Sequence, residues 1–121
     1  MSFQIKEFST IRIFSDDVQK SRDWYKAFLG LEPLEDSENF VSFKIGQTCF
    51  DITVPDLKNP LSAGGTVGYW LVDDLDALVQ KAESLGGKVY RGPLVVSEIQ
   101  RTILQIQDPI GNTIGFECPI Q

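Results

Sequence analysis

The chain contains one internal repeat that spans most of its length. Residues 11–18 join a strand-like run to an acidic doublet, Ile-Arg-Ile-Phe-Ser-Asp-Asp-Val, and about half a chain length later residues 69–75 do the same with Tyr-Trp-Leu-Val-Asp-Asp-Leu. An amphipathic helical pattern follows each doublet and ends on Leu-Gly, at 29–30 and again at 85–86. Because the period is nearly half of the 121 residues, the sequence predicts two copies of one supersecondary unit. Such a fold brings two sheets together, and small ligands usually lie between elements packed in this way.

Each copy is predicted to follow the order β-α-β-β-β. The acidic doublets supply the oxygens that cap the free amides of a helix N-terminus, and the first helix is expected over about 18–28. Gly46 leads a two-residue loop that suits a type II′ hairpin turn. Strands are expected at 11–14, 40–45, 48–53, 66–72, 88–90, 102–106 and 113–117, and turns at 36–39 and 108–112.

We expect one domain built from two modules. A chain of 121 residues is near the usual domain size and can bury about 65% of the surface of its unfolded state. The segment 55–65 holds two prolines and two glycines, so it is predicted to connect the modules and not to separate domains. The first module is therefore placed at 8–54 and the second at 66–118.

Charge and hydropathy exclude several classes of protein. A net charge of −6 without a basic cluster argues against nucleic acid and favours a neutral or cationic small molecule. No apolar run reaches the length of a membrane span, and residues 1–7 lack the apolar core of a signal peptide, so we expect a cytoplasmic protein. Cys49 and Cys118 fall in strand-like runs, where free thiols pack as small hydrophobes.

Three segments carry a resemblance to a known family. The segments 16–31 (Asp-Asp-Val-x-x-Ser-x-x-Trp-Tyr-x-x-x-Leu-Gly-Leu), 72–78 (Val-Asp-Asp-Leu-Asp-Ala-Leu) and 108–112 (Asp-Pro-Ile-Gly-Asn) resemble the vicinal-oxygen-chelate superfamily, which includes glyoxalase I, extradiol dioxygenases and bleomycin-resistance proteins. The resemblance covers about residues 8–118. It implies an α+β fold in which two βαβββ modules form a cup-shaped, curved mixed sheet. It also implies a homodimer, because that family pairs modules within or between chains.

Enzymes of that family hold a divalent metal in the cup, usually with His and Glu. The corresponding positions fall here on Thr10, Asp51, Val67 and Gly115, and the chain contains no histidine. One carboxylate beside Val and Gly is not a competent set of ligands for a catalytic metal. We therefore expect neither a bound metal nor another cofactor.

Strand alternation predicts which side chains enter the cup. Arg12 and Asp51 are expected on inward faces of the first module, and Tyr69 and Glu117 on those of the second. Arg12 needs a planar acceptor there, which Asp51 or Glu117 could supply. The pair could fill the former metal space or read a ligand, and the alternative is an Arg12 that faces outward.

Further roles are predicted for these residues and for one more. Tyr69 is the better candidate for stacking on a ligand, and Arg101 is either a residue that closes the cup or a solvated charge at a strand end. Asp51 and Glu117 are also the candidate general bases if the protein is an enzyme. The predicted ligand-binding set is thus Arg12, Asp51, Tyr69, Arg101 and Glu117.

The preferred interpretation is metal-independent binding of a small organic molecule, cationic or aromatic, in the manner that the resemblance to bleomycin-resistance proteins implies. The first alternative is a glyoxalase-type isomerase, a lyase or a dioxygenase-like enzyme with a degenerate or metal-free site. A second alternative is an interaction protein whose cup is collapsed. No nucleic-acid or membrane partner is expected, and nothing in the sequence separates sequestration of a ligand from metal-free catalysis.

Overall fold

Two four-stranded mixed sheets, each covered by one helix, make up the fold. The computed structural model describes residues 3–62 and 65–120. In the first module the strands lie in the order β1-β4-β3-β2 and in the second in the order β5-β8-β7-β6, with β1–β4 and β5–β8 parallel. This arrangement confirms the predicted α+β fold of two βαβββ modules.

The elements follow one another as the repeat predicts. The first module contains β1 (Thr10–Phe14), α1 (Val18–Leu29), β2 (Glu35–Ser37), β3 (Phe40–Ile45) and β4 (Thr48–Thr53). The second contains β5 (Tyr69–Leu71), α2 (Leu75–Ser84), β6 (Lys88–Val96), the 3₁₀ turn η1 (Ser97–Ile99), β7 (Arg101–Gln107) and β8 (Thr113–Pro119).

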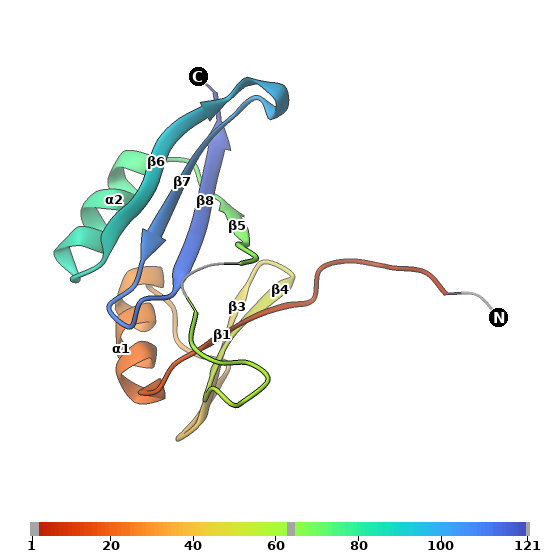
Figure 1. Ribbon diagram of the computed structural model, residues 1–121, viewed down its shortest axis with the longest axis vertical. Helices are drawn as coiled ribbons and strands as arrows, with labels where there is room; N and C mark the ends of the chain where they lie inside the picture. The colour runs from red at the N-terminus through yellow and green to blue at the C-terminus, as the bar shows by residue number, and fades with distance from the viewer. Residues whose placement is uncertain (1–2, 63–64, 121) are drawn as a thin grey trace.

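Both helices lie on the same side of the molecule and leave the other side of each sheet open. Figure 1 shows α1 and α2 on the left, one above the other, with the strands to their right. The segment before β1 leads away from the domain on the open side. The cup predicted from the resemblance is therefore an open, curved surface within this chain.

The helix ends confirm the predicted caps. The Asp17 carboxylate accepts a hydrogen bond from the Lys20 amide, and Gly30 ends α1 with a φ of 68°, which an L side chain adopts only with strain. In α2 the Asp74 carboxylate accepts from the Ala77 amide in the same way. The two acidic doublets thus act as local start signals in both modules.

One turn prediction and two strand predictions were wrong in extent. The turn expected at 36–39 is confined to 38–39, because Glu35–Ser37 pairs with β3 as β2 despite its polar composition. The strand expected at 66–72 shrinks to β5, which lies at the end of its sheet beside β8. The strand expected at 88–90 extends to Val96, and its Pro93 is tolerated because β6 lies at the sheet edge and shifts its register there.

Aromatic side chains join the two modules on the helix side. Phe28 of α1 meets Phe116 of β8 with ring centres 5.9 Å apart, and Phe50 of β4 meets Trp70 of β5 at 6.1 Å. Edge-to-face contacts at such distances contribute about 1 kcal/mol each beyond the area that they bury. The modules therefore share one continuous hydrophobic core.

Hydrogen bonds between the modules add to this packing. The Trp24 indole N–H donates to the Leu85 carbonyl at 2.7 Å, and the side-chain amide of Asn112 donates to the Phe14 carbonyl at 2.7 Å. Within the described part of the chain, neither helix is long and apolar enough to cross a membrane.

Candidate ligand-binding site on the open sheet face

The five residues of the predicted set lie on strand positions that face away from the helices. In β4 and β5 the neighbours of Asp51 and Tyr69 are Phe50 and Trp70, which pack into the shared core. Because side chains alternate along a strand, Asp51 and Tyr69 themselves point to the opposite, open face. The same alternation places Arg12, Arg101 and Glu117 on that face.

Arg12 and Asp51 form the ion pair that the sequence predicted. They are direct neighbours across β1 and β4, and Nη2 of Arg12 lies 2.9 Å from Oδ2 of Asp51. The Asp51 side chain is 6% exposed, whereas that of Arg12 is 50% exposed. The guanidinium therefore reaches from a buried carboxylate to the surface. Glu117 lies in the other sheet and is not the partner.

One oxygen of this pair is unsatisfied. Among the described residues, no hydrogen-bond donor reaches Oδ1 of Asp51, although the atom is buried. A buried acceptor without a partner costs about 1–3 kcal/mol. A bound molecule that donates to this oxygen would recover part of that free energy.

A polar hollow of about 350 Å³ lies beside Arg12. It is lined by Arg12 and Phe14 from β1, by Thr113 at the start of β8, and by residues of the connection that include Lys58 and Asn59. Asp56 orders this part of the connection, because its carboxylate accepts hydrogen bonds from the Lys58 and Asn59 amides. The hollow thus brings two cationic side chains together in a chain whose net charge is −6.

Sequence reasoning missed Lys58 as a site residue. Nothing in the order of residues indicates that the connection folds back toward β1. The sequence therefore gave no reason to place Lys58 near Arg12. The expected preference for a cationic ligand came from the net charge of the whole chain, whereas the charged side chains that line this hollow, Arg12 and Lys58, are cationic.

The predicted residues of the second module lie apart from this hollow. The Tyr69 side chain lies over Gly115 of β8. A Cβ at Gly115 would come within 2.8 Å of the Gly68 carbonyl oxygen and would touch the Tyr69 ring. The Tyr69 hydroxyl accepts a hydrogen bond of 2.7 Å from Gln105. Nη1 of Arg101 is buried with no hydrogen-bond partner among the described residues. Tyr69, Arg101 and Glu117 lie on three strands of the other sheet, β5, β7 and β8.

The structure shows what surrounds Asp51 and Gly115, the two last-strand positions at which the family's enzymes hold their metal. In the parallel strand pairs Asp51 lies opposite Arg12, and Gly115 lies opposite Tyr69. The guanidinium of Arg12 pairs with the Asp51 carboxylate, and the ring of Tyr69 lies against Gly115. Within the described ranges, no three His, Cys, Asp or Glu side chains gather as metal ligands. The residues present do not fit the metal of the family's enzymes.

Comparison with known proteins agrees with this architecture. The profile of the Glyoxalase/Bleomycin resistance protein/Dioxygenase superfamily matches residues 7–116, and the chain belongs to this family. None of the curated proteins compared with the chain matches it significantly.

Solved structures share the fold at low sequence identity. The chain is similar to TnmS3, an antibiotic-binding protein from Streptomyces sp. CB03234, with 22% identity and a TM-score of 0.77 over 98% of this chain and 99% of the other. It is also similar to a glyoxalase/bleomycin resistance protein from Albidiferax ferrireducens T118, with 21% identity and a TM-score of 0.74 over 92% and 98% of the two chains.

Proposed function

We propose that the protein binds a small organic molecule at the hollow beside Arg12 and does so without a resident metal. The observation that carries this proposal is the half-exposed guanidinium held by a buried carboxylate. Arginine has five N–H donors in a rigid fork, and the bond to Asp51 uses one of them. The remaining donors are available to acceptor oxygens of a ligand.

The charges around the hollow favour a ligand with an anionic or strongly accepting group. Arg12 and Lys58 both line it, and a carboxylate or phenolate between two cations gains charge-assisted hydrogen bonds. Phe14 supplies an apolar wall for the body of the ligand. An aromatic acid therefore fits this hollow better than the cationic ligand suggested by the net charge.

Membership in the family supports binding of small molecules in general. The structural neighbour TnmS3 is described as an antibiotic-binding protein, and its fold covers nearly the whole of this chain. The reactions considered as alternatives, with Asp51 or Glu117 as base, stay predictions.

We also propose a homodimer that covers the open sheet face. Exposed apolar side chains support this proposal: Phe3 and Ile5, in the segment that leads away on the open side, are 86% and 88% exposed. Tyr69 and Leu71 add apolar surface on β5 itself. Soluble monomers rarely leave such a surface uncovered.

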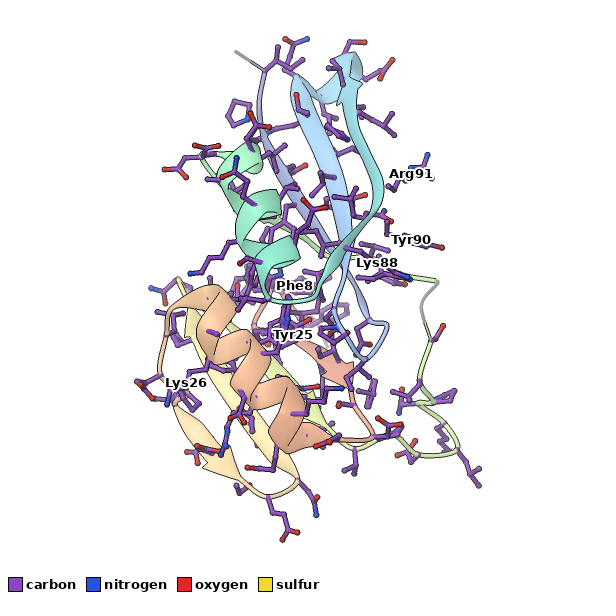
Figure 2. All side chains as sticks on the ribbon, turned by 90° about the vertical axis from the view of Figure 1, so that its left-hand side faces the viewer. Phe8, Tyr25, Lys26, Lys88, Tyr90 and Arg91 are labelled. Atoms are coloured by element: carbon purple, nitrogen blue, oxygen red, sulfur yellow. The ribbon has the colours of Figure 1, made fainter. Side chains whose placement is uncertain are left out.

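Calorimetric titration with 2-naphthoate, an aromatic carboxylate, tests the binding proposal. Arg12→Met should raise Kd at least about tenfold, because it removes a charge-assisted hydrogen bond. Lys58→Met should raise Kd about threefold while it leaves the Arg12–Asp51 pair intact. Arg91→Met is the matched control, since Arg91 is exposed on β6 and points away from the domain in Figure 2. An unchanged Kd in both the Arg12 and Lys58 variants would contradict the proposal.

A further inference from the structure

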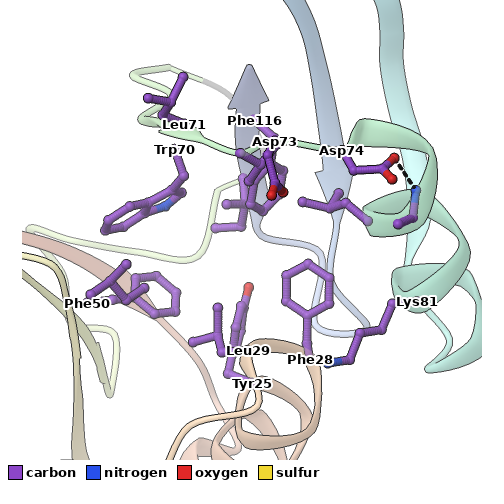
Figure 3. Close-up of a pocket in the computed structure, with 15 residues that line it drawn as sticks. Tyr25, Phe28, Leu29, Phe50, Trp70, Leu71, Asp73, Asp74, Lys81 and Phe116 are labelled. Carbon is purple, nitrogen blue, oxygen red and sulfur yellow. Dashed lines mark hydrogen bonds between the residues drawn. The ribbon is translucent and has the colours of Figure 1, made fainter. Parts of the chain in front are cut away.

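A second pocket lies on the opposite side of the molecule, between the modules. It has a volume of about 360 Å³ and is lined from α1, β4, β5, α2 and β8 (Figure 3). This volume falls in the lower range of small-molecule sites in proteins. The strand residues Phe50, Trp70 and Phe116 point toward the helices, and the pocket shares no lining residue with the hollow beside Arg12.

The walls of the pocket are aromatic and come from both modules. Phe28 and Phe50 belong to the first module, and Trp70 and Phe116 belong to the second. Figure 3 shows the phenyl ring of Phe28 below the space, Trp70 beside it and Phe116 above it. Phe28 touches Phe116 and Phe50 touches Trp70 edge-to-face, with ring centres 5.9 and 6.1 Å apart, so the rings form one continuous aromatic wall across the two modules. Such walls suit a flat apolar body.

The charged groups at the rim divide into an acidic and a basic end. Asp73 lies on the same side as Phe116, between Trp70 and Asp74 in Figure 3. The Asp74 carboxylate caps α2 through the Ala77 amide, whereas Asp73 is exposed at the mouth. Lys81 reaches toward the end of α1 at the other side, close to Gly30. An ammonium group beside Asp73 would also lie near aromatic ring faces, which attract cations.

We propose that this pocket is a second binding site, for an organic ammonium ion with a flat apolar body. The body lies against the aromatic wall that the two modules form together, and the ammonium group pairs with Asp73. This site does not depend on the function proposed for the open face, because it uses other residues and the opposite charge. Occupation of the pocket would also clamp the two modules together.

Titration with three probes of one shape tests the charge preference. 2-Naphthylmethylamine should bind with a Kd about fivefold lower than that of the neutral 2-naphthylmethanol. Asp73→Asn should abolish this difference, whereas Asp76→Asn should preserve it, because Asp76 is an exposed carboxylate on α2 that does not line the pocket. The third probe, 2-naphthoate, reports on the Arg12 hollow, so the two sites are measured independently.

A larger side chain inside the pocket tests whether the amine binds there. Ala77 lines the pocket from an exposed position on α2, so Ala77→Phe should remove binding of the amine and leave binding of 2-naphthoate unchanged. Nuclear Overhauser contacts from the bound amine to the Trp70 indole give the same information in the parent protein. Equal Kd values for amine and alcohol would overturn the proposal, and so would undiminished amine binding in Ala77→Phe. A dimer that Ala77→Phe converts to monomers would also overturn it, because a second copy would then cover the pocket.

Discussion

The hydrogen bond between Tyr25 and Asp108 is the most specific link between the two modules. Tyr25 lies on α1 and is 1% exposed, and its hydroxyl donates to Oδ2 of Asp108 at 2.6 Å. The other oxygen of Asp108 accepts from the Ile110, Gly111 and Asn112 amides, each at 2.9 Å. Asp108 thus orders the turn between β7 and β8 and anchors it to the first module.

Tyr25→Phe removes this link without changing the shape of the ring. A hydrogen bond to a charged group contributes about 1.5–3 kcal/mol, and its loss leaves Oδ2 of the buried Asp108 without this donor. We expect the free energy of unfolding to fall by about 2 kcal/mol at pH 8. Urea unfolding followed by circular dichroism measures it, with Tyr90→Phe as the control, since Tyr90 is 55% exposed.

Tyr25→Phe should also change how the free energy of unfolding responds to alkaline pH. Burial raises the pKa of Tyr25 well above its ordinary value of 10.0, and the neighbouring Asp108 charge raises it further. Above pH 10 the unfolded chain releases this proton while the folded chain keeps it, so stability falls by about 1.4 kcal/mol per pH unit. Phenylalanine has no such proton. The destabilisation of Tyr25→Phe should therefore shrink from pH 10 to pH 11.

Two results would refute this reasoning. One is a free energy of unfolding within about 0.5 kcal/mol of the parent at pH 8, which would mean that the bond contributes no more than an exposed one. The other is an equal alkaline slope in parent and variant, which would mean that the tyrosine titrates in the folded protein as it does in the unfolded chain.

Three further predictions concern the ion pair, the assembly and the metal. In a double-mutant cycle of Arg12→Met and Asp51→Asn, the coupling free energy should be about 1–2 kcal/mol, because solvent screens the half-exposed guanidinium; zero coupling would contradict a structural pair. Sedimentation equilibrium at micromolar concentration should give twice the chain mass of 13.5 kDa, and a single-chain mass would argue decisively against the dimer. The melting temperature should be the same in EDTA as in added Ni²⁺, Mn²⁺ or Zn²⁺, and a drop in EDTA reversed by one ion would restore the metal-dependent enzyme as the first interpretation.

Local signals determined the order of the elements. The Asp caps, the Leu-Gly helix ends and the alternation in 40–45 and 48–53 act over a few residues, so they are legible in the chain alone. The same alternation predicted that Arg12 pairs with Asp51 or Glu117, and the register of β1 with β4 selected Asp51.

Tertiary structure decided the features that depend on residues far apart in the sequence. β2 and the long β6 exist because neighbouring strands supply their backbone partners, and their composition alone does not predict them. Lys58 reaches the Arg12 hollow because the connection folds back. The ring contacts between Phe28 and Phe116 join residues from opposite halves of the chain, and they create the pocket between the modules. A sequence pattern reports which face a side chain takes, whereas the distance between two faces depends on how the modules pack.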